Sequence, residues 1–546
     1  MVVPELRAWR AARPRLARLA RAARPRLVRA ARPRLVRAAR TVGPRVARLT
    51  EAAGTRLTKP KTWHYTAGAA TAGLALAAGV VTAAGPWDSS GQRTAERDRA
   101  AALGRTGGAD HGRRTGTPDP SDASDVSGSA ADGGVKPAPS AVPVLVGLGG
   151  AGDPARPASD TSALAAALDP LLRDAALGTR HAAAVIDVTT GERLYGQDAD
   201  DPHVPASTTK IATAVAALSA LGPDHRLTTR AALEPGTGKL ALIGGGDPTL
   251  TARKDAGNLA SLRTLAADTA TALSKRRVTE VTLSYDTTLY AGTSLHPIGV
   301  NDNLAPVTAL MADEGRTGDS TSGPAPRVAD PAADAARVFA DLLSGHGVRT
   351  TVAGAAGATG RAETLATVSS PPLSSLVERM LTNSDNDIAE ALARQTAAAT
   401  GGRPDFAGGA AAITAQLRKL GLPLKGADFH DGSGLDRSDR LTADLLTALL
   451  AKAADPAAPG LRPVLTGLPV AGFTGTLTSR YTDGAAGLVR AKTGTLTGVN
   501  TLAGTLVAHN GHLLAFAFLA ENTTAPEAAQ TALDHAATTL ATCTCT

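Results

Sequence analysis

A serine and a lysine three residues apart, Ser207 and Lys210, form the pair in this chain best suited to nucleophilic chemistry. On a helix, positions i and i+3 share one face, so the lysine amine can reach the serine hydroxyl. Serine is a weak nucleophile until a base takes its proton, and lysine can be that base where burial or neighbouring cations lower its pKa. The same spacing fits an ordinary helix start with a serine N-cap and an exposed lysine. Lys210 is nevertheless the only lysine with a serine three positions before it.

A second serine, Ser384, stands two residues before Asn386, and no other asparagine in the chain has this neighbour. The triplet lies where a loop enters a predicted helix. The Ser384 hydroxyl could relay a proton to a leaving amine, and the Asn386 amide could hold a substrate or orient Lys210. A plain N-cap also explains a serine and an aspartate at a helix start, and for this triplet alone it is the simpler explanation.

Downstream, Lys492, Thr493 and Gly494 form a triplet that also occurs once, and Thr495 follows it. A cation with two hydroxyls on a strand edge suits a substrate carboxylate. Gly494 would let a ligand approach the backbone closely, and the backbone N–H groups of Ser207 and Thr495 could stabilise an oxyanion. A strand that simply ends in a turn is the alternative. Together, the three unique patterns are far more specific than any one of them.

The elements that must position these residues come from both ends of the C-terminal body. Alternating and apolar runs predict a β-hairpin over 182–195 and three later strands, with Asn510-Gly511 as a favoured turn between the last two. A helix with one apolar face follows Ser207. The segment 222–365 has strand-like runs of its own, which indicates an insertion within one α/β unit. The expected helices are 162–172 and 525–540, and the expected strands are 182–188, 192–195, 239–243, 278–284, 487–492, 502–507 and 513–519.

The N-terminal residues differ from this body in charge. Residues 1–61 hold 18 lysines and arginines but two acids, whereas the remainder of the chain holds 39 basic and 47 acidic residues. We therefore expect a basic Arg/Pro-rich cytoplasmic arm over 1–62. It could be a tail that mainly fixes topology or an arm held on anionic lipid, with nucleic-acid contact as the runner-up. Nucleic-acid binding by the body is not implied.

An uncharged run follows the arm. Tyr65–Trp87 is long enough to span a membrane, and Trp63 and Trp87 flank it as interfacial residues do. We expect a transmembrane signal-anchor over 63–87 that places the catalytic body on the cell-wall side, or a leader whose cleavage secretes the body. Residues 88–160 are rich in small and polar residues and predict a disordered linker.

Taken together, Ser207-Thr-Thr-Lys210, Ser384-Asp-Asn386 and Lys492-Thr-Gly494 resemble the motifs of the penicillin-recognising serine enzymes. The surrounding sequence is similar to the D-alanyl-D-alanine carboxypeptidase/endopeptidase family, the class C low-molecular-mass penicillin-binding proteins. The similarity spans about 160–542. The further segments that carry it are Pro205–Ala214, Gly244–Leu250, Ala305–Leu310 and Asp431–Leu435.

The resemblance implies an α/β (α+β) fold, a transpeptidase-like or β-lactamase-like domain over 161–221 and 366–546. Helices would flank an antiparallel five-stranded sheet, and a smaller domain would be inserted over 222–365. The implied enzyme is a serine-type D-Ala-D-Ala carboxypeptidase or endopeptidase that acts on peptidoglycan stem peptides through an acyl-serine. β-Lactams would be covalent inhibitors, and neither a cofactor nor a metal would be needed.

The resemblance also assigns roles. Ser207 would be the nucleophile and Lys210 its base, with Ser384 and Asn386 as the other catalytic residues. The substrate-binding residues would be Lys492, Thr493, Gly494 and Thr495. The chain departs from the family at Asp436, where serine is usual, and at Asp439, where asparagine is common.

Three other functions remain open at this point. A β-lactamase or esterase could use the same motifs, and a non-catalytic wall-binding protein could retain the pocket. The basic arm could instead be the main functional part and recruit a cytoplasmic partner. The only cysteines, Cys543 and Cys545, offer no disulfide framework and no cysteine-based metal site.

Overall fold

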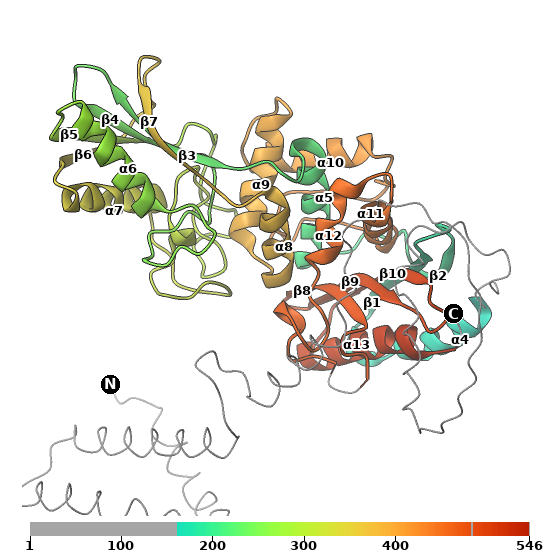
Figure 1. The fold of residues 1–546 in the computed structure, drawn as a ribbon. Coiled ribbons are helices and arrows are strands. Elements are labelled where there is room, and N and C mark those ends of the chain that lie inside the picture. Colours follow the sequence, from blue (N-terminus) through green and yellow to red (C-terminus); the bar gives the residue numbers. More distant parts are fainter. Residues whose placement is uncertain (1–160, 482–483, 545–546) are drawn as a thin grey trace, which may run out of the picture. The chain divides into compact units, whose positions relative to one another are not determined.

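Two five-stranded sheets organise the residues that this computed structural model describes, 161–481 and 484–544 (Figure 1). The strand order is β2-β1-β10-β9-β8 in the first sheet and β6-β5-β4-β3-β7 in the second. The predicted arm (1–62), membrane anchor (63–87) and linker (88–160) lie outside the described residues. Within the described ranges, no helix has the length and apolarity that a membrane span requires.

The first sheet joins the two ends of the described chain. Every neighbouring pair in it is antiparallel, so the predicted antiparallel five-stranded sheet is confirmed. The turn between its last two strands contains Gly511 at a φ of 83°, a conformation that glycine adopts without strain. The strands are β1 (Arg180–Asp187), β2 (Arg193–Gln197), β8 (Val489–Leu496), β9 (Val499–Val507) and β10 (Leu513–Glu521).

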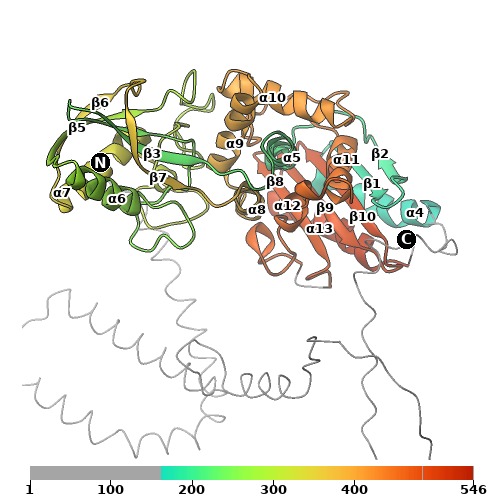
Figure 2. The ribbon, with the colours of Figure 1, turned by 45° about the horizontal axis from the view of Figure 1, so that its top comes forward.

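Helices cover both faces of this sheet, as predicted (Figure 2). On one face, α4 and α13 pack together, and on the other face α11 covers β1, β9 and β10. The helix α5 lies beyond α11 and contacts α8, α9 and α10 as well. The bounds are α4 (Thr161–Leu172), α5 (Thr209–Leu221), α8 (Leu373–Asn383), α9 (Asn386–Ala399), α10 (Phe406–Lys419), α11 (Ala443–Ala454), α12 (Pro463–Thr466) and α13 (Pro526–Thr542).

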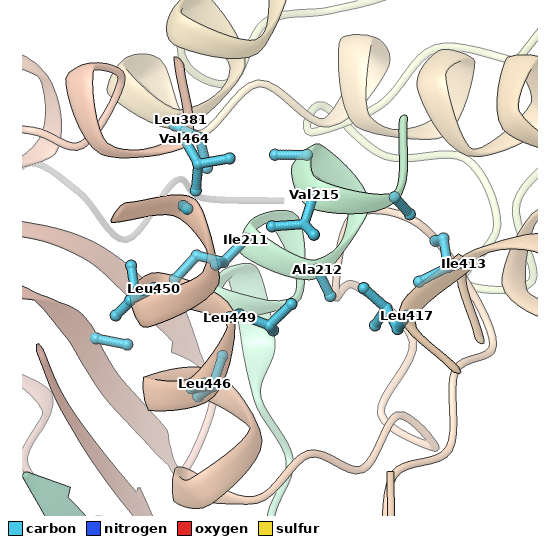
Figure 3. Close-up of a cluster of buried hydrophobic side chains, with 14 of the residues drawn as sticks. Ile211, Ala212, Val215, Leu381, Ile413, Leu417, Leu446, Leu449, Leu450 and Val464 are labelled. Carbon is cyan, nitrogen blue, oxygen red and sulfur yellow. The ribbon is translucent and has the colours of Figure 1, made fainter. Parts of the chain in front are cut away.

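The helix α5 is the centre of a hydrophobic cluster (Figure 3). Every residue from 209 to 218 is buried. Burying one large aliphatic side chain contributes about 1.5–3 kcal/mol to stability, so this packing fixes the helix that begins beside Ser207. The side chains that surround α5 in the figure include Ile413 and Leu417 of α10 and Leu446, Leu449 and Leu450 of α11.

The second sheet lies between α5 and α8 in the sequence. Its pairs β4–β5 and β5–β6 are parallel because α6 and α7 provide the crossovers, whereas β3 pairs antiparallel with β4 and β7. The last strand ends at Ser369, four residues past the predicted limit of the inserted domain, and the division into domains stays a prediction. The bounds are β3 (Thr228–Glu234), β4 (Lys239–Ile243), α6 (Leu262–Lys275), β5 (Glu280–Asp286), α7 (Pro331–Gly345), β6 (Arg349–Ala355) and β7 (Glu363–Ser369).

The segment 287–328, which we call the connecting segment, joins β5 to α7 without a regular helix or strand beyond one 3-10 turn, Asp313–Gly315. It reaches the start of α9. The Ala305 N–H donates to Asp387 Oδ1 at 2.9 Å, and the Asn303 carbonyl accepts a bond from Asn386 Nδ2 at 2.9 Å. The part of the chain that carries the second sheet therefore also touches the second motif.

Candidate active site

Ser207 lies in a 3-10 turn, Ala206–Thr208, immediately before α5, and Lys210 lies in the first turn of that helix. Lys210 Nζ is 3.0 Å from Ser207 Oγ, which is the geometry that the i,i+3 spacing predicted. The turn is strained, since Ala206 has a φ of 48°. Two glycines accommodate it. A Cβ on Gly434 would lie 1.9 Å from the Ala206 carbonyl oxygen, and a Cβ on Gly494 would lie 3.1 Å from the Ala206 Cβ.

Lys210 is completely buried and has three partners. Besides Ser207 Oγ, Nζ donates to Asn386 Oδ1 at 2.7 Å and to the Ser433 carbonyl at 2.6 Å. Burial lowers the pKa of Lys210 to about 8, against the opposing effects of nearby carboxylates, of which Asp431 is the largest. A lysine with this pKa is partly neutral near physiological pH and can accept a proton from the serine.

The second motif occupies the break between α8 and α9. Ser384 ends α8 in the left-handed conformation, with a φ of 58°. Asp385 then caps α9 by accepting the Ile388 N–H at 3.0 Å, and Asn386 is the first residue of α9. Asp385 therefore caps the helix, as the N-cap explanation of this triplet required. The side chains of Ser384 and Asn386 are not used for capping and bond the two lysines instead.

The third motif lies on β8, the edge strand of the first sheet. Lys492 is fully buried, and Nζ donates to Ser384 Oγ at 2.9 Å and to the Thr493 carbonyl at 2.7 Å. Burial, and then repulsion from Lys210, holds the pKa of Lys492 well below its usual range. Thr493 Oγ1 donates to Thr476 Oγ1 at 2.8 Å, and Thr495 is exposed.

The predicted strand 487–492 was too short. The ladder between β8 and β9 continues through Gly494 opposite Thr501, so the motif lies within the strand and not at its end. Gly494 is required there, because a Cβ would lie 2.1 Å from Thr501 Oγ1 and 2.8 Å from the Pro205 carbonyl. The close approach brings β8 against the turn that holds Ser207, where we predicted an oxyanion hole from two backbone N–H groups.

Five of the eight predicted site residues therefore form two bonded groups, Ser207 with Lys210 and Asn386, and Lys492 with Ser384. Gly494 lies against the Ser207 turn, and Thr493 and Thr495 are its neighbours on β8. Sequence reasoning missed three contributors: the Ser433 carbonyl, the Asn303 carbonyl and the Thr476 hydroxyl. Two of them act through backbone oxygens, which carry no residue signature. Only Ser433 lay in a segment, Asp431–Leu435, that the resemblance had marked.

Two buried groups among the described residues have metal-ligand side chains close together: His296, Glu390 and Asp431, and Glu314, Asp385 and Asp387. Most of their carboxylates already pair with protein groups. Guanidinium groups of Arg316 and Arg379 pair with Glu314, and that of Arg327 pairs with Asp387. The Glu390 oxygens accept the Gly432 N–H, and Asp431 accepts several backbone N–H groups. These residues fit ion-pair and hydrogen-bond networks that brace the site.

Known proteins with similar sequences identify the family of this chain. The model of the D-Ala-D-Ala carboxypeptidase 3 (S13) family matches residues 164–326 and 317–542. A carboxypeptidase of Mycobacterium tuberculosis is 36% identical over a 411-residue alignment that covers 71% of this chain and 87% of that protein. Carboxypeptidase DacB of Mycolicibacterium smegmatis is 37% identical over a 378-residue alignment that covers 66% of this chain and 80% of that protein.

Among solved structures, penicillin-binding protein 4 (dacB) from Haemophilus influenzae has the same fold. The TM-score is 0.57 at 21% identity, and the match covers 69% of this chain and 98% of that one. The matches to the two sequence relatives cover most of the length of those proteins, and the family model covers nearly all of the described body. The chain belongs to the D-Ala-D-Ala carboxypeptidase 3 (S13) family of serine peptidases.

Proposed function

We propose that this protein removes the terminal D-alanine from peptidoglycan stem peptides, with Ser207 as the nucleophile. The single observation that carries the proposal is the position of the Lys210 amine, 3.0 Å from Ser207 Oγ and 2.7 Å from Asn386 Oδ1 in a fully buried site. A base so placed, with a pKa lowered to about 8 by burial, activates a hydroxyl that would otherwise be inert.

In the acylation step, Ser207 Oγ attacks the carbonyl carbon between the two D-alanines and its proton passes to Lys210 Nζ. Backbone N–H groups of Ser207 and Thr495 would stabilise the oxyanion, an interaction of a kind that contributes roughly 10²–10³ in rate per donor. As the tetrahedral intermediate collapses, the C–N bond breaks and the departing amine takes, through the Ser384 hydroxyl, the proton that Lys210 received. Water then attacks the acyl-serine and gives a proton to Lys210, which passes it to Ser207 Oγ as the ester C–O bond breaks.

The third motif supplies the binding of the substrate carboxylate. Lys492 is a buried lysine whose amine already bonds Ser384 Oγ, and Thr493 and exposed Thr495 follow it on the edge strand. A terminal carboxylate would accept from the two hydroxyls and be attracted by the lysine. Endopeptidase action would instead place a cross-linked side chain next to Thr495.

β-Lactams provide the test, because they acylate the nucleophile of such a site and stay attached. Intact-mass spectrometry after incubation with a penicillin should show one adduct on the native chain and none on Ser207→Ala. Ser219→Ala is the matched control, since Ser219 lies exposed near the other end of α5. An adduct on Ser207→Ala would refute the nucleophile, and rapid release of hydrolysed penicillin would favour the β-lactamase alternative.

We further propose that the body works on the cell-wall side of a membrane, held by 63–87 with the basic arm in the cytoplasm. The support is the uncharged Tyr65–Trp87 run beside a strongly basic segment. Protease added to intact spheroplasts should remove the body and leave the arm. Complete protection of the body would contradict this orientation.

A further inference from the structure

A buried histidine in the connecting segment, His296, bonds Asp431, the first residue of the turn whose Ser433 carbonyl accepts a bond from Lys210. His296 is almost inaccessible to solvent, and its Nε2 lies 3.0 Å from Asp431 Oδ2. Its Nδ1 accepts the Ile298 N–H at 3.2 Å, so Nε2 carries the proton and donates to Asp431. The ring packs edge-on against Phe406, with centroids 5.1 Å apart. The orientation of the imidazole is therefore fixed from three sides.

Asp431 organises the turn that follows it. Its carboxylate accepts the backbone N–H groups of Ser433 at 3.0 Å, Gly434 at 2.6 Å and Asp436 at 2.8 Å. This turn points the Ser433 carbonyl at Lys210 Nζ, 2.6 Å away, and presses Gly434 against the Ala206 carbonyl. One carboxylate thus positions a partner of the base and supports the strained turn before the nucleophile.

The connecting segment supports Lys210 a second time. Seven residues after His296, the Asn303 carbonyl accepts a bond from Asn386 Nδ2, and Asn386 Oδ1 in turn accepts one from Lys210. Two of the three partners of the lysine, Asn386 and Ser433, are therefore held by one stretch, 296–303. At one end of this stretch, His296 bonds Asp431, which positions the Ser433 carbonyl. At the other end, the Asn303 carbonyl bonds Asn386 itself.

We propose that His296 is a positioning residue for Lys210, which holds the Asp431 turn in place and offsets the negative charge of Asp431 beside the base. The proposal deepens the proposed function and depends on it. Without the histidine, the Asp431 carboxylate would lose the Nε2–H donor that stabilises its charge, would act more strongly on Lys210 and would favour the protonated, inactive amine.

The electrostatics of the pocket agree with this sign. Asp431 has the largest charge effect that raises the pKa of Lys210, although burial outweighs it. Burial lowers the pKa of His296, but its bond to Asp431 and the nearby carboxylates outweigh burial, so the net shift is upward. The charged or titratable groups that face this pair are Asp385, Glu390, Asp431, Asp436, Asp439 and Lys492, with Arg394 over the far side of Phe406.

Two substitutions separate the hydrogen bond from the ring. His296→Gln keeps an N–H donor near the Nε2 position but loses the ring that orients it, whereas His296→Phe keeps a ring without a donor. His430→Gln is the matched control. His430 is the residue before Asp431, but its ring is 42% exposed and pairs with Asp428 on the surface.

The measurement is the second-order rate of penicillin acylation of the full-length protein from pH 5.5 to 9.5, together with the melting temperature. For His296→Phe we expect the acid limb of the plot of acylation rate against pH to move upward by roughly 1 pH unit, which lowers the rate near pH 7 about tenfold. His296→Gln should move in the same direction by a smaller amount, and His430→Gln should match the native protein.

The outcomes are distinct. A native chain that is not acylated at Ser207 contradicts the proposed function, whatever the variants do. If the native chain is acylated and the limb of His296→Phe is unmoved, even where its rate or stability falls, His296 is only structural and the proposal is wrong. Should His296→Phe not fold, an unshifted His296→Gln overturns the proposal on its own.

Discussion

Lys492 Nζ donates to Ser384 Oγ at 2.9 Å, so the amine of the third motif is bonded to the hydroxyl of the second. Lys210 holds the other member of the second motif, Asn386, at 2.7 Å. Each of the two buried lysines therefore bonds a different residue of the second motif, Lys492 bonding Ser384 and Lys210 bonding Asn386. A relay through Ser384 depends on this arrangement, because Lys492 orients the hydroxyl and favours its deprotonated form, while Lys210 remains available to Ser207.

Replacing Lys492 should therefore impair the leaving-group step as well as binding. For Lys492→Met we expect carboxypeptidase kcat/KM to fall about 10²–10³-fold, since the buried amine that donates to Ser384 Oγ is lost. Lys452→Met is the control, because Lys452 lies on α11 and pairs with Asp455, away from the site. Steady-state release of D-alanine from a D-Ala-D-Ala peptide measures the effect. An unchanged kcat with only a raised KM would restrict Lys492 to binding.

The lowered pKa of Lys210 predicts the pH dependence of the native protein. The amine acts as a base only when neutral, so the acylation rate should rise with pH and level off above about 8, the pKa to which burial lowers this group. Stopped-flow acylation by a chromogenic β-lactam between pH 5.5 and 9.5 would record the limb. A rate that keeps rising to pH 10 would show that Lys210 has an ordinary lysine pKa.

The sequence predicted the first sheet because its strands are apolar runs with clear turns. It also predicted Ser207 with Lys210, because helical spacing alone brings those side chains together. It could not predict that Lys492 would bond Ser384, 108 residues earlier, since that contact depends on how α8, α9 and β8 meet in space. The Ser433 and Asn303 carbonyls were invisible for a further reason: any residue type can present a backbone oxygen.

Gly434 is the clearest case of a residue required by packing beside the nucleophile. Its φ is 80°, and a Cβ would lie 1.9 Å from the Ala206 carbonyl oxygen. Gly434→Ala should therefore cost more than the roughly 1 kcal/mol expected for left-handed backbone alone, and it should displace the turn that holds Ser207. We expect acylation to fall at least tenfold in a destabilised protein, as measured by urea unfolding and penicillin labelling.

Gly191→Ala is the control that separates the cost of the left-handed backbone from the cost of the contact with Ala206. Gly191 has a φ of 74° in the turn between β1 and β2, and a Cβ there would meet nothing within 4 Å. It should show the backbone cost without any loss of acylation. Equal effects of the two substitutions on stability and labelling would mean that the contact with Ala206 has no special importance.

Asp439 stands where the resemblance implies an asparagine, and its surroundings favour a neutral side chain. It is buried, it accepts the His430 N–H at 2.7 Å and the Thr209 hydroxyl at 3.3 Å, and it lies close to Asp431. Burial, and then repulsion from Asp431, raises the pKa of Asp439 to about 10. Its side chain is therefore protonated at neutral pH and resembles an asparagine amide in charge and shape.

This similarity predicts a stabilising substitution. A carboxyl whose pKa is raised in the folded state stabilises fully only below its unfolded pKa, near 4, and that contribution declines as pH rises toward 10. Asparagine has no such cost, so Asp439→Asn should be nearly equal to the native protein at pH 4.5 and should gain relative stability toward pH 8, by up to about 1.4 kcal/mol for each pH unit. Urea unfolding at the two pH values, with exposed Asp428→Asn as the control, measures this difference. A substitution that destabilises the protein more at pH 8 than at pH 4.5 would mean that Asp439 is ionised and that its charge supports the site.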